Sequence, residues 1–237
     1  MRGSFCRLSM LAGLLPLVFC AAGLGTPQNG FLAQYKGTPY QDSRYKGGAQ
    51  KIPGTVLCAY YDLGGEGVAY HDSDEENHGS GELNKADGSY LNEFRMHEGV
   101  DTSYTKFGHP TPIDDNPFNK FVPPANLLYV GWTEAGEWFN MTVQAVNAGE
   151  YTADLLYTSN RGGAISLDVN GASATGPLKI VSTLDEAEPV EWRQWHHWNL
   201  ARNFVKLELP KGTSVITVHI LAEGQMNLAT LEFRKAE

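Results

Sequence analysis

An aromatic ring followed closely by two acidic side chains is the feature of the sequence that best suggests chemistry. Trp132 lies beside a glycine, and Glu134 and Glu137 follow it within five residues. A flat indole can stack on the C–H face of a sugar ring, while neighbouring carboxylates accept hydrogen bonds from its hydroxyls. This combination is typical of a surface that recognises pyranose rings. The alternative is that Trp132 only closes the end of a folded β structure, because most large apolar side chains are structural.

The same two glutamates suggest a catalytic alternative, a small secreted glycanase or lyase. A glycanase needs paired carboxyl groups about 5 to 10 Å apart, one of them with a raised pKa. Glu134 and Glu137 share one short loop and would lie on one side of a groove, whereas catalytic carboxyls flank the bond that is cut. His196 and His197 lack a third ligand at metal-binding spacing, and no Gly-x-Ser-x-Gly motif is present. The sequence therefore favours a binding protein over an enzyme.

Alternating apolar residues after Trp138 define the elements that must position these side chains. The period of two is that of a strand with one buried face, and it includes Phe139, Met141, Val143, Ala145, Tyr151, Ala153 and Leu155. Strands are expected at 55–61, 129–131, 138–146, 151–157, 164–169, 203–209, 214–222 and 228–233. Turns rich in Asn and Gly follow several of them, and no segment has a helical period over three turns. The pattern predicts an all-β fold, a jelly-roll-like β-sandwich in a single domain.

The 237 residues divide into three parts. Residues 1–25 have two arginines, an apolar stretch and small residues at the end, which is the layout of a secretory signal peptide; the apolar run is shorter than the roughly 20 residues of a membrane span. Residues 26–50 lack a sustained period and are expected to form a linker or arm. Residues 51–237 are expected to form the β-sandwich domain, and the aromatic residues of its long stretch 64–124 indicate packing rather than disorder. The protein is therefore expected to be secreted.

Composition narrows the partners. The net charge of −9 argues against nucleic acid and fits neutral glycans better than polyanionic ones. With 42% hydrophobic and 11% aromatic residues, the chain can bury a substantial core, and a monomer without membrane contact is expected. Once the leader is removed, Cys58 is the only cysteine, so no intrachain disulfide can form. A lone cysteine on an apolar strand is typical of a core position.

Several blocks, in order along the chain, resemble carbohydrate-binding module family 6. The resemblance extends over about residues 52–233 and rests on segments 52–62, 64–72, 77–79, 98–101, 130–138, 148–151, 192–195, 209–212 and 227–228, together with Arg95. It implies a jelly-roll-like sandwich that binds a polysaccharide or oligosaccharide without cleaving it. Family members take different glycans through differences in their loops, and some use a second cleft on a sheet face.

The resemblance also implies site residues. In the family, two aromatic rings at one end of the sandwich clasp a sugar and an asparagine hydrogen-bonds to it. By correspondence of the blocks, Trp132 is the first ring, Trp192 the second and Asn227 the amide. Glu137 is a further candidate for a sugar hydroxyl, although a solvated role is the alternative. Two other tryptophans, Trp195 and Trp198, are expected in the core or at the rim.

The chain departs from the family where calcium is commonly held. A glutamate on the first strand and an aspartate on the last are replaced by Ala59 and Ala229, so no calcium and no other cofactor are expected there. The acidic run 72–76 is either a weak candidate for a different cation site or an ordinary solvated loop. A third functional hypothesis, a cell-surface module that binds a protein, stays open because exposed aromatic residues would also serve that role.

Overall fold

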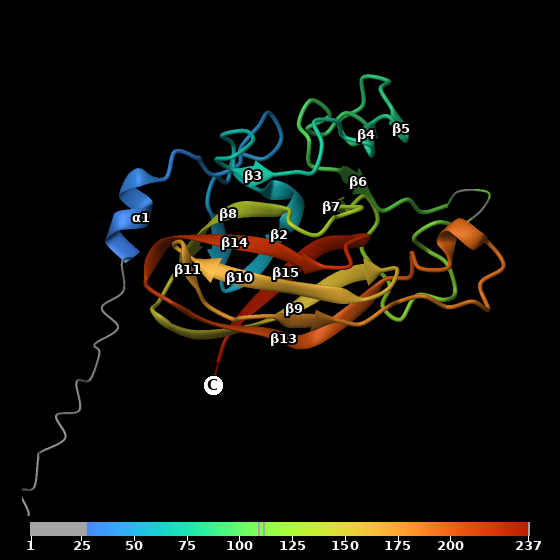
Figure 1. Cartoon of the computed structure of the whole chain (residues 1–237). Helices are drawn as coiled ribbons and strands as arrows, with labels where there is room; N and C mark the ends of the chain where they lie inside the picture. Colours follow the sequence, from blue (N-terminus) through green and yellow to red (C-terminus); the bar gives the residue numbers. More distant parts are fainter. Residues whose placement is uncertain (1–27, 109, 111, 237) are drawn as a thin grey trace, which may run out of the picture.

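Strands dominate the computed structural model, which describes residues 28–108, 110 and 112–236. The expected signal peptide lies outside the described residues. Figure 1 shows two sheets packed face to face, with α1 (Gln28–Gln34) at one end of the sandwich and the 3₁₀ turn η2 (Glu191–Arg193) at the other. The predicted all-β, jelly-roll-like sandwich is confirmed.

One sheet has seven strands and includes the strand with the first alternating apolar residues, Phe139 to Ala145. Its central path follows the order β1 (Gln50–Ile52), β8 (Trp138–Ala145), β14 (Gly212–Ala222), β10 (Gly163–Val169) and β11 (Ala172–Ser173). The short strands β3 (Tyr70–His71) and β12 (Leu178–Ile180) pair with β8 and β10. Apart from β1, which runs parallel to β8, the pairs are antiparallel.

The second sheet has six strands and carries the candidate site. Its order is β13 (Asn199–Leu209), β9 (Gly149–Ser159), β15 (Met226–Lys235), β7 (Leu128–Val130) and β6 (Thr102–Tyr104). Strand β2 (Gly54–Leu57) pairs with the far half of β15. The strands β4 (Ser80–Gly81) and β5 (Asn84–Lys85) form a separate small pair in the loops above.

The core lies between the two sheets and follows the predicted alternation. Each of the seven apolar residues predicted to face inward on β8 and β9 is at most 2% exposed. Burial of a large apolar side chain contributes about 1.5 to 3 kcal/mol, so these residues from both sheets contribute substantially to the stability of the fold. Cys58 is also buried, but the predicted strand 55–61 ends at Leu57 and Cys58 begins the 3₁₀ turn η1 (Cys58–Tyr60). Burial raises the pKa of its thiol to about 12.

The segment before β1 lies against the domain, although the sequence predicts a linker or arm without a fold of its own. Tyr40 is 5% exposed and stacks on Tyr60, with ring centroids 4.9 Å apart. The carboxylate of Asp42 accepts hydrogen bonds from the hydroxyls of Tyr40 and Tyr90, at 2.6 and 2.7 Å. The segment between α1 and β1 is therefore packed on the domain. Scattered tyrosines give no period, which is why the packing cannot be seen in the sequence.

A smaller apolar layer covers the outer face of the six-stranded sheet near β7. A register shift between Leu228 and Thr230 leaves Ala229 as an extra residue in β15. Ala229 packs outside the main core with Tyr129, Leu156 and Trp198. Phe121, from the loop between β6 and β7, covers this cluster. The long region 64–124 is thus packed onto the sandwich as predicted, and it builds one wall of the candidate site.

Candidate functional site

A hollow of about 680 Å³ brings the two predicted indoles together. Trp132 follows β7 and Trp192 lies on η2, and both line this hollow. Figure 1 shows that the segment around η2 lies at the end of the sandwich opposite α1. Trp195 and Tyr129 add two more rings to the walls. The polar lining residues are Asn84, Lys106 and His196.

The Trp132 main chain has a conformation that large residues rarely adopt. Its φ of 45° lies in the left-handed region, which costs about 1 to 3 kcal/mol for a non-glycine residue. Neighbouring contacts hold it there: the Trp132 N–H donates to Asn227 Oδ1 at 3.2 Å, and the next residue, Thr133, exchanges hydrogen bonds with Met226. The ring passes so close to Gly79 that a Cβ atom at Gly79 would lie 3.1 Å from it. The half-buried Trp132 ring is therefore fixed from two sides.

Trp192 is more open, being 55% exposed, but its turn is anchored. The Arg193 guanidinium makes two hydrogen bonds to the Glu188 carboxylate, at 2.8 and 2.9 Å, and both side chains are buried. This bidentate pairing is a strong, directional interaction. Arg193 also donates to the carbonyl of Pro112 on the facing loop. The exposed indole is therefore presented by a rigid support.

Asn227 lies beneath the hollow and not in its lining. The side chain is 0% exposed, with its oxygen bound to the Trp132 main chain. Its nitrogen lies 3.0 Å from Nδ1 of His196. Both ends of the amide are thus engaged within the protein. The structure brings Asn227 next to Trp132, as the sequence predicts, but as a support for the ring.

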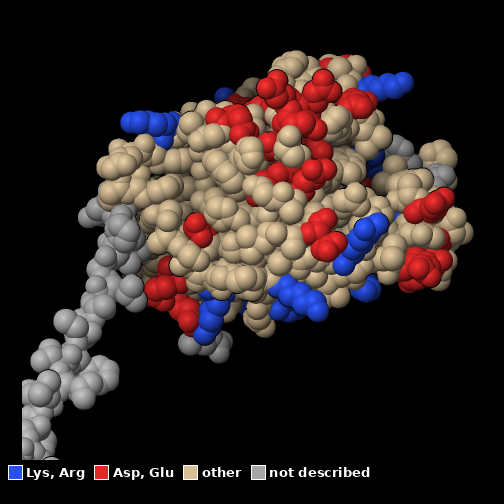
Figure 2. Space-filling view, in the orientation of Figure 1, with Lys and Arg blue, Asp and Glu red and all other residues tan. Residues whose placement is uncertain are grey.

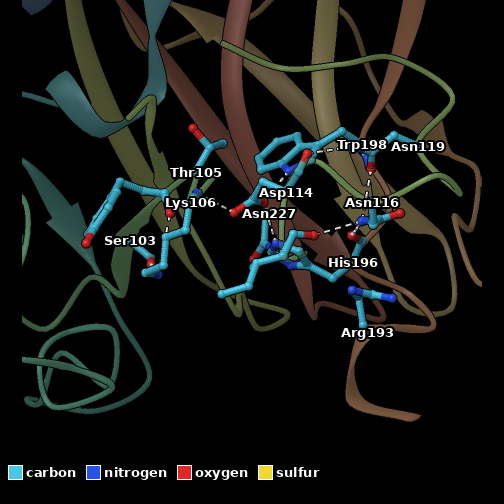
Figure 3. Close-up of polar contacts among 12 residues, drawn as sticks. Ser103, Thr105, Lys106, Asp114, Asn116, Asn119, Arg193, His196, Trp198 and Asn227 are labelled. Atoms are coloured by element: carbon cyan, nitrogen blue, oxygen red, sulfur yellow. Dashed lines mark hydrogen bonds and ion pairs between the residues drawn. The ribbon is translucent and has the colours of Figure 1, made fainter. Parts of the chain in front are cut away.

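His196 continues this chain of hydrogen bonds to a buried carboxylate. Its Nε2 lies 2.8 Å from Oδ1 of Asp114, which also accepts a hydrogen bond of 2.6 Å from the Trp198 indole N–H. Figure 3 shows Asp114 among Trp198, His196 and Lys106, whose main-chain N–H donates to its other oxygen at 2.6 Å. Burial raises the pKa of Asp114, but the hydrogen bonds from His196, Trp198 and the Lys106 main chain outweigh burial and lower the pKa overall. Asp114 is therefore an ionised anchor below the site.

Lys106 is a partly sequestered cation in the same wall. Its Nζ lies 3.3 Å from Ser103 Oγ and 4.5 Å from the centre of the Tyr104 ring. Burial lowers the pKa of Lys106, and the Asp114 charge opposes this shift. An ammonium group held on neutral partners can donate hydrogen bonds to hydroxyls of a bound molecule.

Glu137 belongs to a neighbouring, acidic hollow of about 570 Å³ that shares Trp132 and Leu83 with the first. Its carboxylate accepts main-chain hydrogen bonds from Glu134 at 2.7 Å and Ser73 at 3.3 Å. The acidic residues of this lining are Asp72, Asp74, Glu82, Asp101, Glu134 and Glu137. Figure 2 shows acidic side chains gathered over the loops above the strands.

Burial is the main reason why three of these carboxyl groups hold their protons unusually well. It raises the pKa of Glu137 to about 7 and that of Asp101 to about 7, and the nearby Asp72 charge adds to both shifts. The pKa of Asp72 itself is raised to about 6 by burial and by the Asp74 charge. Close to neutral pH this hollow is therefore less anionic than its composition suggests.

The described residues include His, Cys, Asp and Glu, the side chains that most commonly ligate metals. No group of three or more His, Cys, Asp or Glu side chains is arranged to hold a metal ion among those residues. Ala59 and Ala229, at the positions where the family commonly holds calcium, are both fully buried and offer no side-chain oxygen. Asp72 and Asp74, from the acidic run, line the acidic hollow together with His78.

Three residues of the aromatic hollow could not be assigned from the sequence. Tyr129 stands on a predicted strand, but only the covering loop shows that its ring faces the site. Lys106 lies in a region with no periodic pattern. The sequence suggests His196 only as a metal ligand, because its partners Asp114 and Asn227 are 82 and 31 residues away. Trp195 lies at the rim and Trp198 is fully buried, as predicted.

Solved structures of known proteins resemble this fold, whereas no family model and no curated protein matches the chain. A family 6 carbohydrate-binding module of Clostridium stercorarium in complex with cellobiose is 10% identical, with a TM-score of 0.47 over 80% of this chain and 99% of that one. A β-1,3-glucan-binding family 6 module of Bacillus halodurans is 13% identical, with a TM-score of 0.43 over 78% and 98%. A family 35 module of Clostridium thermocellum is 22% identical, with a TM-score of 0.37 over 50% and 84%. At these identities the similarity describes the fold alone.

Proposed function

We propose that this protein is a secreted, non-catalytic carbohydrate-binding module that holds part of a polysaccharide or an oligosaccharide at the end of its sandwich. The observation that carries the proposal is that Trp132 and Trp192, 60 residues apart in the sequence, line one hollow. A hollow of about 680 Å³ is within the usual range for small-molecule sites. Two indoles with few polar groups between them suit the alternating apolar and hydroxylated surface of a sugar.

Binding would combine stacking with a small number of hydrogen bonds. The rings exclude water from the C–H faces of the sugar, and Asn84 and Lys106 donate to its hydroxyls. Stacking contributes about 0.5 to 1.5 kcal/mol per ring, and hydroxyl groups exchange water for protein at little net gain. The dissociation constant is therefore expected between about 1 µM and 1 mM.

Glu137 extends the site into the acidic hollow on the other side of Trp132. Near pH 7 its carboxyl is partly protonated and could donate to or accept from a second sugar unit, without the calcium for which Ala59 and Ala229 provide no ligands. Export would depend on residues 1–25. Within the described residues, no helix has the length and apolar character needed to cross a bilayer.

The test is affinity electrophoresis through gels that contain soluble polysaccharides. Replacement of the exposed ring in Trp192→Ala should weaken binding about tenfold and abolish retardation, while the free energy of unfolding changes by less than about 0.5 kcal/mol. Trp138→Ala is the matched control, because Trp138 lines a separate hollow of about 360 Å³ with Phe31 and Tyr35. If Trp138→Ala abolishes retardation and Trp192→Ala does not, the site lies on the sheet face.

A second candidate function, glycan cleavage, is favoured by the raised pKa values of Glu137 and Asp101 in one cleft. Perturbed carboxyl groups are common at catalytic sites. The two functions separate in an assay for new reducing ends or unsaturated products. We expect no product; product formation that disappears in Glu137→Gln would replace the binding proposal. If no polysaccharide retards the wild-type protein and none is cleaved, a protein partner becomes the leading hypothesis.

A further inference from the structure

We propose that His196, oriented by Asp114, is a positioning residue that fixes Trp132 through Asn227. This series of hydrogen bonds is complete only while His196 Nδ1 is unprotonated. The inference rests on the proposed function in one respect, that Trp132 is part of the sugar site. It concerns residues that need not touch the sugar. Asp114, His196 and Asn227 are each at most 6% exposed, and each is hydrogen-bonded to the next.

The donors and acceptors of these hydrogen-bonded groups allow only one placement of the protons. The Trp132 main chain offers a donor, so the Asn227 atom that faces it must be the carbonyl oxygen. The NH₂ group of Asn227 then faces His196 Nδ1, which must accept. A neutral imidazole that accepts at Nδ1 carries its proton on Nε2, and that proton points to the Asp114 carboxylate. Each group thus determines the orientation of the next.

Protonation of His196 at Nδ1 would disrupt this matching of donors and acceptors. A proton on Nδ1 would face the NH₂ group of Asn227, donor against donor. Rotation of the amide would restore that contact but would turn NH₂ toward the Trp132 N–H. Asn227 Oδ1 also lies close to the Gly131 main chain, since a Cβ atom added at Gly131 would be only 3.0 Å from it. Without rotation, Asn227 loses the hydrogen bond to His196 that orients its amide, and with rotation Trp132 loses the hydrogen bond that holds it in the left-handed region.

The groups around His196 determine whether a protonated ring is stabilised. Asp114, from the loop between β6 and β7, stabilises an imidazolium, and its other partners are the Trp198 indole and the main chain of Lys106. The Lys106 ammonium is the nearest like charge in the same wall. The remaining neighbours of the ring are aromatic: Tyr129 from β7, Trp195 and Trp198, with centroids 5.7 to 6.2 Å away. Asp114 thus accommodates the cation, whereas Asn227 does not.

Two substitutions in the full chain separate a positioning role from a structural one. His196→Asn keeps an acceptor near the Nδ1 position but cannot be protonated, so it should preserve the hydrogen bond to Asn227 and the support of Trp132. His196→Leu removes the acceptor. The first measurement is the hydrogen-exchange protection of the Trp132 amide, by NMR, between about pH 8 and about pH 5. The second is the retardation of the same proteins by the best-bound polysaccharide over the same range.

In wild-type protein, we expect protection of the Trp132 amide and affinity for the polysaccharide to fall together by about tenfold as the pH is lowered. In His196→Asn both should be within about threefold of wild type at pH 8, and protection of the Trp132 amide should no longer follow the wild-type fall. The affinity of this variant should keep only the pH dependence that comes from Glu137. In His196→Leu both should be low throughout. The amide of Met141, in the core strand β8, is the internal control and should stay protected in every variant.

The result that would overturn the inference is an identical pH profile in wild type and His196→Asn, or an undisturbed Trp132 amide in His196→Leu. If His196→Leu does not fold, the comparison of wild type with His196→Asn still decides. The two proposals fail separately. A pH-sensitive Trp132 amide in a protein that no polysaccharide retards would retain the positioning chain and reject the sugar site, and pH-independent protection in a protein that binds would do the reverse.

Discussion

Trp132 combines a strained main chain with a place in the candidate site. Its left-handed main chain costs free energy, and the hydrogen bond from Trp132 to Asn227 together with those between Thr133 and Met226 offset it. The arrangement places an indole between two hollows, one aromatic and one acidic. At this scale, the acidic side chains of the second hollow carry charges that depend on pH, because the pKa values of Glu137, Asp101 and Asp72 are raised.

Asp101 offers a test of this electrostatic picture. Burial raises its pKa to about 7, whereas an unfolded aspartate titrates near about 3.9. The folded protein therefore binds more protons between these values, and stability rises as the pH falls from about 7 toward about 4. Asp101→Asn, which keeps an acceptor for the His78 main chain, should raise the melting temperature at about pH 8 and do so progressively less at lower pH.

Thermal unfolding of both proteins between about pH 8 and pH 5 measures the effect. A melting temperature that is lower in Asp101→Asn at every pH would show that the carboxylate stabilises the fold, contrary to the prediction.

At the scale of elements, the N-terminal segment 28–50 is part of the fold. Tyr40 and Tyr45 pack against Tyr60 in η1, and Asp42 links the segment to Tyr90. Although partial burial opposes it, hydrogen bonds from Tyr40, Tyr45 and Tyr90 lower the pKa of Asp42 to about 2. The segment thus joins the loops that carry β4 and β5 to the first strand of the sandwich.

Removal of this link should be measurable. Asp42→Ala removes the acceptor of four hydrogen bonds and should lower the free energy of unfolding by about 1 to 3 kcal/mol. Asp42→Asn is the matched control, because it retains an acceptor for the main-chain donors and should cost less. Denaturant unfolding at neutral pH provides the values; equal stability of wild type and Asp42→Ala would mean that the segment packs without contributing.

At the scale of the whole molecule, the sandwich separates its core from its site. The core lies between the sheets, and both hollows lie among loops outside it. The net charge of −9 surrounds the site with a negative field, which repels polyanions and leaves neutral glycans unaffected. Figure 2 shows that many of the acids gather on one part of the surface.

Salt should therefore distinguish two classes of glycan. Retardation by a neutral polysaccharide should change less than about twofold between about 0.01 M and 1 M salt, because stacking is not screened. A carboxylated polysaccharide should be bound more weakly at low salt and gain affinity as screening increases. Stronger binding of the carboxylated chain at low salt would instead assign the dominant role to Lys106.

The sequence by itself determined most of the long strands, the inward-facing residues of β8 and β9 and the two indoles of the candidate site. Alternation on β8 and β9 is a local pattern, because strand side chains must alternate between core and solvent wherever one face is buried. Trp132 and Trp192 stand outside such patterns, in turn-rich segments, and both were assigned to one site through the resemblance to family 6.

Only the tertiary structure decided which residues hold that site in place and which of its polar groups carry protons. Asp114, Asn227 and His196 come from three different segments, and nothing local to any of them shows that they form one hydrogen-bonded chain. Burial of Asn227 depends on the loop between β6 and β7 and on the segment around η2, which meet only when the sandwich closes. A protonation pattern depends on which groups are near in space, and sequence separation says nothing of that distance.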